Sequence, residues 1–152
     1  MSKFVFLNTR YVEFKDAKIH IEDRGFQFSD SVYEVIKVIN NNLFDFDYHM
    51  GRLKYSTKEL KFNIKIDNIF FNKIFINLIK KNRLTNGIVY LQITRGEQPR
   101  EHAYKKNLKP NIIAYTSKKK FNFPNKNFKG YKAITYPDIR WGRPDIKTTS
   151  LL

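Results

Sequence analysis

The sequence predicts an α+β domain with a largely antiparallel or mixed sheet, and the order of its segments leads to this prediction. Short segments with aromatic and β-branched residues come first, two segments with helical patterning follow, and strand-like segments come last. Strands and helices that are grouped in this way, rather than alternating, are typical of α+β architecture. The chain of 152 residues is long enough for one domain with a hydrophobic core and too short for two of ordinary size.

Segment 31–40, SVYEVIKVIN, is the clearest strand candidate. Alternate residues of a strand point to opposite faces, and both faces of this segment are mainly apolar. A strand of this kind is typical of the middle of a sheet, so we expect it to be central. The asparagines at 40–42 then predict a turn into segment 43–46, because asparagine tolerates left-handed backbone conformations. Six further segments are predicted to be strands: 3–8, 10–14, 18–23, 86–96, 111–117 and 130–137.

Two helices are predicted in the middle of the chain. Asp47 is the expected N-cap of a helix that extends to about Leu60, with Met50 and Leu53 on its apolar stripe. Asp67 is the expected N-cap of a second helix, which covers residues 68–82. The apolar face of this second helix is broad and requires burial, and the lysines in its last turn suit the negative end of a helix.

The chain is predicted to contain one complete domain and the beginning of another. The lysine-rich stretch SKKKFNFPNKNFKGYK surrounds a proline and has the composition of a solvated linker. We therefore expect a small α+β domain over residues 1–120, followed by a linker and a connecting strand over 121–136. Residues 137–152 are too few for a core of their own, so we expect them to begin a truncated second domain.

The formal net charge of +15 raises the question of a nucleic-acid partner. The lysines are scattered along the chain and accompany many Asn, Ile, Phe and Tyr residues, which is the composition that an A/T-rich genome imposes. We therefore expect no nucleic-acid partner. A non-catalytic basic domain that binds nucleic acid or a protein is the alternative from a different functional class.

Several other classes of protein are disfavoured by the composition. There is no cysteine, and the three histidines are far apart in sequence, so we expect neither a disulfide framework nor a metal site. The N-terminal residues lack the apolar core of a signal peptide, and no apolar run is long enough to span a bilayer. We expect a soluble, cytoplasmic protein that does not bind membranes.

The stretch TRGEQPREHAY contains two side chains suited to binding a carboxylate. Pro99 ends the preceding strand and favours extended conformations in its neighbours. Residues two apart in an extended segment project to the same side, so we expect Arg100 and His102 to lie side by side. A guanidinium fork and an imidazole together fit a carboxylate group. The other interpretation is a surface loop with ordinary solvated charges.

Lys147 lies in the segment RPDIKTTSLL near the end of the chain, in an otherwise uncharged run just after an Arg-Pro-Asp turn. A lysine that acts as a nucleophile requires partial burial or nearby positive charge, so that enough free amine exists near neutral pH. Arg140 and Arg143 precede it closely and are candidates for that positive charge. The other interpretation is a solvent-exposed lysine in a loop.

Candidate site residues also occur at two places nearer the N-terminus. Arg52 lies in the first predicted helix but off its apolar stripe, where it faces either a phosphate group or water. Tyr33 and Glu34 lie near the start of the best strand candidate, and the ends of strands are common positions for site residues. A tyrosine that is buried there requires a partner for its hydroxyl group.

Four segments together resemble one family: EDRGFQFSDSVYEVIKV, LFDFDYHMGRL, VYLQITRGEQPREHAY and RWGRPDIKTTSLL. Their order and approximate spacing are similar to those of the class IV pyridoxal-phosphate-dependent aminotransferases, and the stretch TRGEQPREH is closest to the D-amino-acid (D-alanine) aminotransferase branch. The resemblance covers nearly the whole chain. It implies the N-terminal α/β domain of the fold type IV enzymes, with the second domain truncated. Branched-chain aminotransferases and aminodeoxychorismate lyases share this layout and remain alternatives.

The resemblance also implies roles for individual residues. Lys147 matches the catalytic lysine that holds pyridoxal 5'-phosphate covalently, and Arg52 matches the arginine that binds the phosphate group of this cofactor. Tyr33, Arg100 and His102 match the residues that bind the substrate carboxylate. In this family the arginine and the histidine reach the site from the neighbouring subunit, which implies a homodimer.

The implied reaction transfers the amino group of D-alanine to 2-oxoglutarate and gives pyruvate and D-glutamate. Lys147 would move a proton at the substrate α-carbon, first as general base and then as general acid. Family members continue into a second domain that supplies a glutamate facing the pyridine nitrogen and most of the phosphate contacts. Because these groups lie beyond residue 152, we expect the chain to be inactive by itself.

Overall fold

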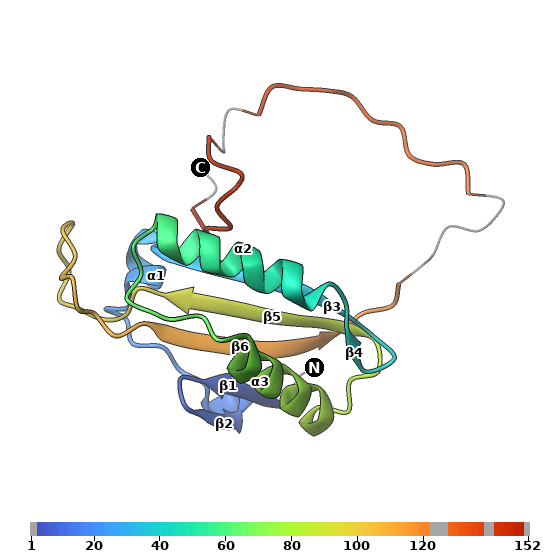
Figure 1. Ribbon diagram of the computed structural model, residues 1–152, viewed down its shortest axis with the longest axis horizontal. Helices are drawn as coiled ribbons and strands as arrows, with labels where there is room; N and C mark the ends of the chain where they lie inside the picture. Colours follow the sequence, from blue (N-terminus) through green and yellow to red (C-terminus); the bar gives the residue numbers. More distant parts are fainter. Residues whose placement is uncertain (1–2, 122–127, 139–141, 151–152) are drawn as a thin grey trace.

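The computed structural model describes residues 3–121, 128–138 and 142–150. Its strands form one sheet in the order β2-β1-β6-β5-β3-β4, and every pair of neighbours in it is antiparallel, as predicted (Figure 1). The strands are β1 (Phe4–Leu7), β2 (Arg10–Glu13), β3 (Ser31–Ile39), β4 (Asn42–Leu43), β5 (Gly87–Thr94) and β6 (Asn111–Lys118). The helices are α1 (Arg24–Phe28), α2 (Phe46–Glu59) and α3 (Asn68–Lys81), with a 3-10 turn η1 at Phe14–Asp16.

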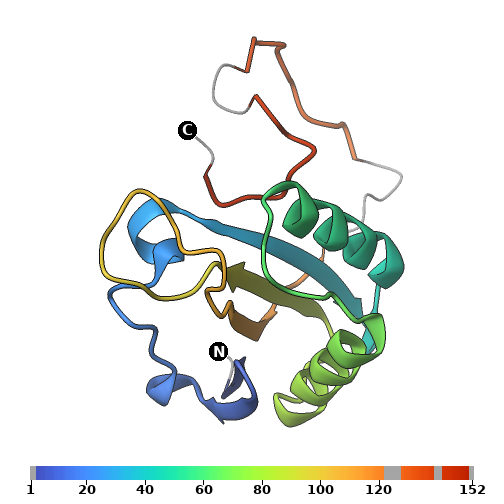
Figure 2. The same ribbon diagram turned by 60° about the vertical axis from the view of Figure 1, so that its left-hand side comes forward.

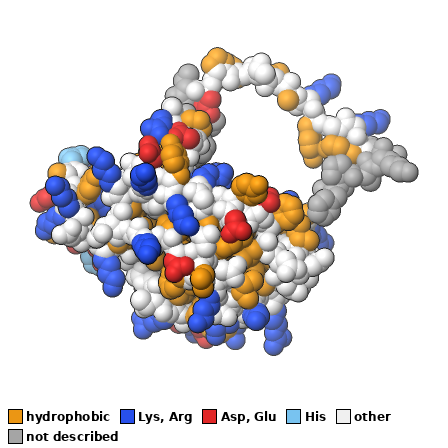
Figure 3. Space-filling model, in the orientation of Figure 1, with side chains coloured by type: hydrophobic (Ala, Val, Ile, Leu, Met, Phe, Trp, Pro, Cys, Tyr) orange, Lys and Arg blue, Asp and Glu red, His pale blue; other side chains and the backbone are white. Residues whose placement is uncertain are grey.

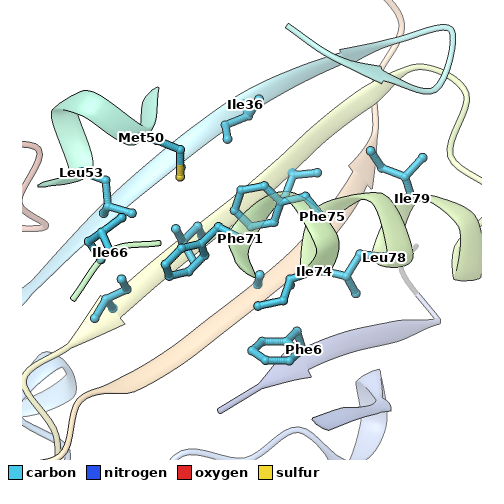
Figure 4. Close-up of a cluster of buried hydrophobic side chains, with 14 of the residues drawn as sticks. Phe6, Ile36, Met50, Leu53, Ile66, Phe71, Ile74, Phe75, Leu78 and Ile79 are labelled. Carbon is cyan, nitrogen blue, oxygen red and sulfur yellow. The ribbon is translucent and has the colours of Figure 1, made fainter. Parts of the chain in front are cut away.

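The domain has two layers, because α2 and α3 cover the same face of the sheet (Figure 2). The hydrophobic core lies between these layers, where aromatic residues of α3 meet side chains of α2 and the central strands (Figure 4). Phe71 and Phe75 of α3 are 1% and 0% exposed. Met50 and Leu53 of α2 are both 0% exposed, which confirms the predicted apolar stripe of that helix.

The alternation of side chains along β3 divides the sheet into a covered face and an open face. Val32, Glu34, Ile36 and Val38 are buried on the face that the helices cover, whereas the residues that alternate with them are only half-buried. On the open face, Tyr33 stacks on Tyr90 of β5, with ring centroids 5.9 Å apart. Tyr90 in turn contacts Tyr115 of β6 at 5.0 Å. A row of aromatic rings therefore crosses the face that the helices leave open.

The two predicted helix starts have different outcomes. Asp67 is the N-cap of α3 as predicted, since its carboxylate accepts hydrogen bonds from the backbone N–H groups of Ile69 and Phe70. The predicted N-cap Asp47 is wrong by two residues, because α2 begins at Phe46 after Asp45. Asp45 has φ 54°, and its side chain makes no capping hydrogen bond. The chain therefore turns from β4 into α2 through a left-handed residue and not through a capped helix start.

Three predictions about strands are wrong. Segment 18–23 leads into α1 instead of pairing as a strand, because the carboxylate of Asp23 caps that helix at Gly25. Residues 130–137 form no strand within the described part of the chain, and their side chains are exposed, with Tyr131 at 91% and Ile134 at 90%. Segment 31–40 is not central, since β3 is followed by the two-residue edge strand β4. The second apolar face of β3 lies on the open side of the sheet, where Tyr33 is part of the row of aromatic rings.

The surface shows how the positive charge is distributed. Lys and Arg side chains are scattered over the face seen in Figure 3, among polar and apolar side chains, and do not gather in one patch. In the part of the chain that the structure describes, no helix has both the length and the apolar composition needed to cross a membrane.

Replacing Phe75 by alanine is expected to destabilise the domain by about 3–5 kcal/mol, because the ring is fully buried and its removal leaves a cavity. Urea denaturation followed by circular dichroism measures the change. Ile69→Ala in the same helix is the matched control, since this side chain is 81% exposed and its loss is expected to cost less than about 0.5 kcal/mol. Similar losses for the two variants would contradict this account of the core.

Candidate functional site

The segment that contains Lys147 lies beside the beginning of β3, where the short strand β4 does not reach (Figure 1). Thr148 forms an isolated antiparallel bridge with Val32. The backbone N–H of Thr149 donates to the carbonyl of Ser31 at 3.1 Å, and their hydroxyl groups are 2.6 Å apart. Backbone pairing therefore holds residues separated by more than a hundred positions side by side.

Lys147 itself is held between β3 and α2. Its backbone N–H donates to the hydroxyl oxygen of Ser56 at 3.1 Å, and its carbonyl accepts from the backbone N–H of Tyr33 at 2.9 Å. The preceding Ile146 is 6% exposed and anchors the segment. The half-buried side chain of Lys147 places its amine 4.7 Å from the centroid of the Tyr33 ring. The amine and the tyrosine therefore share one location at the edge of the sheet.

A cluster of polar groups ties the residues before Lys147 to α2. The carboxylate of Asp145 accepts two hydrogen bonds from Arg143, at 2.9 and 2.7 Å, and one from the hydroxyl of Tyr55 at 2.7 Å. These bonds, with that from Arg143 the largest effect, lower the pKa of Asp145 far below its ordinary value. Arg143 also donates to Glu59 at 3.1 Å.

The sequence led us to expect positive charge from Arg140 and Arg143 around Lys147, and the contacts of Arg143 do not support this expectation. The guanidinium of Arg143 is paired with two carboxylates, so most of its charge is balanced locally. Arg140 lies outside the described residues. Partial burial, rather than neighbouring arginines, is the feature of Lys147 that the structure supplies.

Arg52 is bound to a buried carboxylate. Its Nε and Nη2 atoms donate to the two oxygens of Glu34, at 2.8 and 2.7 Å, and the Nδ1 atom of His49 lies 2.7 Å from the same carboxylate. The side chain of Glu34 is 0% exposed, whereas that of Arg52 is 43% exposed. Burial raises the pKa of Glu34, but the hydrogen bonds from Arg52 and His49 outweigh it and the pKa is lowered overall. Glu34 therefore holds Arg52 as a permanently charged anchor.

Tyr33, Lys147 and Arg52 gather around the first residues of β3. The hydrogen bond to Glu34 is the main cause that raises the pKa of Arg52, and the electrostatic effect of Tyr33 adds to it. Beside them, the hydroxyl of Tyr90 donates to Gln92 at 3.0 Å. Burial, with smaller effects of two tyrosine neighbours, raises the pKa of Tyr90 to about 12, so this hydroxyl keeps its proton near neutral pH.

The other two predicted site residues occupy a different place. Arg100 and His102 lie in the exposed loop between β5 and β6, and the contacts of the described residues do not join them to Lys147. The prediction that the segment around Arg100 and His102 is extended is wrong, because the chain bends there. Both side chains nevertheless contact the ring of Phe28. Gly96 begins this loop with φ 110°, and a Cβ atom there would lie 2.1 Å from the carbonyl oxygen of Lys109.

Several partners of the predicted residues were not identified from the sequence. His49 and Ser56 are ordinary polar residues of a helix in the sequence, and only the fold brings them to Glu34 and to Lys147. Glu34 carried a usable signal. It alternates with Val32 and Ile36 on an apolar face, and a carboxylate in such a position requires a cationic or hydrogen-bonding partner.

Glu34→Gln is expected to destabilise the domain by about 2–3 kcal/mol near pH 7, because the buried charge pair with Arg52 is lost while Arg52 can still turn to water. The folded-state pKa of Glu34 lies below its ordinary value of 4.5, so the carboxylate stabilises the fold above that value and ceases to do so as the pH falls through the folded pKa. The difference between wild type and variant should therefore shrink in acid. Urea denaturation at about pH 7 and about pH 3.5 tests this.

Glu13→Gln is the matched control, because this exposed carboxylate pairs only with an exposed lysine in the described contacts. We expect a change within about 0.5 kcal/mol at either pH. A Glu34→Gln difference of the same size at both pH values would show that the charge of Glu34 does not contribute.

The chain is similar to known proteins in sequence. Residues 31–152 match the family model described as amino-transferase class IV. D-alanine aminotransferase of Bacillus licheniformis is 40% identical over 149 residues, which cover 97% of this chain and 52% of that protein. The chain thus spans about half the length of the curated relatives that it matches.

Two solved structures share the fold. The branched-chain amino acid aminotransferase of Escherichia coli matches with a TM-score of 0.73 at 20% identity, over 84% of this chain and 47% of that one. The branched-chain aminotransferase of Thermoproteus uzoniensis, solved with norvaline, matches with a TM-score of 0.69 at 18% identity, over 78% and 41% of the two chains. The domain therefore has the fold of the N-terminal part of the fold type IV enzymes, as predicted. The chain belongs to the class IV aminotransferases.

Proposed function

We propose that this chain forms the N-terminal half of a pyridoxal-phosphate-dependent aminotransferase that acts on D-amino acids, and that Lys147 is its catalytic lysine. The observation that carries the proposal is the position of the Lys147 amine, half-buried over the ring of Tyr33, whose neighbour in β3, Glu34, holds Arg52. Membership of the class IV family and the identity of 40% to a D-alanine aminotransferase support it.

The side chains at this edge of the sheet fit the proposed cofactor. An aldehyde requires a primary amine that is partly removed from water, which Lys147 provides. A phosphate group requires a cation, and Arg52 remains 43% exposed while Glu34 holds its Nε and Nη2 atoms. When it is bound, pyridoxal phosphate supplies an electron-withdrawing ring that stabilises negative charge on the substrate α-carbon.

Each residue of the site then has a definite task. The amine of Lys147 holds the cofactor between turnovers and, when it is released by the substrate amine, moves a proton at the substrate α-carbon. The ring of Tyr33 orients the amine through a contact of 4.7 Å. The guanidinium of Arg52, fixed by Glu34, positions the phosphate end. The substrate carboxylate is bound by Tyr33 together with Arg100 and His102.

Arg100 and His102 act, in this proposal, on the site of a second copy of the chain. Within one chain the described contacts of their side chains are with Phe28, and those of Lys147 are with β3 and α2. A homodimer that brings the loop of one subunit to the lysine of the other reconciles these two locations. The relatives are about twice as long as this chain, so the remaining walls of the pocket are expected from the part that the chain does not cover.

There are two enzymatic alternatives: a branched-chain aminotransferase, which differs in substrate, and an aminodeoxychorismate lyase, which differs in substrate and in reaction. Branched-chain aminotransferases share this fold at 20% identity or less among the two solved structures described above, and this degree of likeness concerns the fold alone. The relative at 40% identity is a D-alanine aminotransferase. We therefore favour D-amino acids over branched-chain amino acids or aminodeoxychorismate.

Selective labelling tests the role of Lys147. The chain is incubated with pyridoxal phosphate, the cofactor is fixed to its amine by borohydride reduction, and peptide mapping locates the label. We expect preferential labelling of Lys147 over the exposed lysines, because only its amine lies at the proposed site. Lys147→Ala should remove this label, whereas Lys58→Ala in α2 is the matched control and should retain it.

Even labelling of the lysines, or none at Lys147, would contradict the assignment. In that case, salt-sensitive binding of oligonucleotides would support the alternative of a basic nucleic-acid-binding domain.

Activity tests the substrate. Residues 1–152 are joined to the C-terminal half of the Bacillus licheniformis relative, and the fusion is assayed with 2-oxoglutarate and either D-alanine or L-valine. We expect D-alanine to be preferred, and Lys147→Ala to lower the rate by about 10³-fold because proton transfer loses its catalyst. The chain of 152 residues alone is expected to show no useful rate. Preference for L-valine, or activity of the chain alone, would contradict these expectations.

A further inference from the structure

The loop that carries Arg100 and His102 is closed by a buried amide. Gln98 is 5% exposed, and its side chain donates to the carbonyl of Ala103 at 2.9 Å and accepts from the backbone N–H of Lys105 at 3.0 Å. One side chain thus satisfies backbone groups on the far side of the loop. Its bonds give the loop a defined shape although Arg100 and His102 are exposed.

Arg24 joins this loop to the body of the domain. Its side chain is 5% exposed, and its Nη1 and Nη2 atoms donate to the carbonyls of Glu101 and His102, at 2.7 and 3.2 Å. Its Nε atom donates to Asp30 at 2.9 Å. Asp30 also accepts from the buried Arg95 at 2.7 Å, so its carboxylate balances two cations. The guanidinium of Arg24 therefore binds the two backbone carbonyls on either side of the Cα atom of His102.

Phe28, four residues after Arg24 on the same short helix, provides a surface for the two exposed side chains. The guanidinium of Arg100 lies 4.7 Å from the centroid of this ring, and the ring of His102 lies 5.7 Å from it. Arg24 also contacts the ring, at 4.6 Å. Cations and imidazoles are attracted to aromatic faces, so the ring restrains both side chains at once.

We propose that Arg24 and Phe28 are positioning residues that hold Arg100 and His102 together as a single carboxylate-binding unit. Arg24 sets the path of the backbone, and Phe28 restrains the two side chains. The ligand class, a carboxylate, rests on the function proposed above. A lysine at position 24 keeps the charge but has no planar fork, so it cannot serve Asp30 and two carbonyls in this geometry.

Nuclear magnetic resonance of the full 152-residue chain tests the proposal. Contacts of the Arg100 and His102 side chains with the Phe28 ring are measured, and pyruvate is then titrated as the carboxylate probe. The variants are Arg24→Lys and Phe28→Leu, the latter at a half-buried position where loss of the ring leaves the apolar character. Phe28→Tyr keeps the ring, and Arg10→Lys makes the same change as Arg24→Lys at an exposed site away from the loop.

In the wild type we expect pyruvate to shift the signals of both Arg100 and His102. Arg24→Lys should separate the two side chains from the ring, and both it and Phe28→Leu should weaken pyruvate binding by about tenfold or more. Phe28→Tyr and Arg10→Lys should behave like the wild type. Unchanged ring contacts in Arg24→Lys, or unchanged pyruvate binding in both Arg24→Lys and Phe28→Leu, would overturn the proposal.

The two proposals fail in different ways. If pyruvate shifts neither residue in the wild type, the carboxylate-binding role from the proposed function is wrong. The ring contacts are measured without any ligand, so their loss or retention in Arg24→Lys still decides whether Arg24 positions the loop. If Arg24→Lys does not fold, pyruvate binding by Phe28→Leu decides whether the ring shared by Arg100 and His102 positions them.

Discussion

Burial of the apolar faces of α2 and α3 against a single face of the sheet is the constraint on which the rest of this structure depends. It places Val32, Glu34 and Ile36 inside and leaves Tyr33 on the open face. Because β4 is only two residues long, the beginning of β3 keeps an edge that Thr148 and its neighbours pair with. The candidate site arises where this edge, the open face and α2 meet.

Two carboxylates connect the parts of the molecule that surround this site, the buried Glu34 and the partly buried Asp30. Glu34 fixes Arg52 of α2 to β3, and Asp30 fixes Arg24 and Arg95 beside the loop after β5. Each carboxylate accepts hydrogen bonds from two other side chains, which offsets the free-energy cost of removing its charge from water. In a chain with a net charge of +15, these two acids each hold two cationic or imidazole side chains in place.

Local patterns predicted local structure well and pairing less well. Asp67 was identified as a cap because its carboxylate acts on N–H groups of the next turn. Segment 18–23 was wrongly predicted as a strand, since its alternation of residue types is strand-like while the buried carboxylate of Asp23 directs it into a helix. Residues 130–137 have strand-like composition, but a strand also requires a hydrogen-bonded neighbour.

The sequence by itself determined the α+β class and the apolar faces of both long helices, because these follow from periodicity, and its resemblance to one family supplied the residues of the candidate site. The tertiary structure alone decided that Lys147 lies over Tyr33, that Glu34 holds Arg52, and that Arg100 and His102 share the ring of Phe28. Each of these contacts joins segments that are far apart in sequence. Their distances depend on how the sheet and helices pack, which no local pattern records.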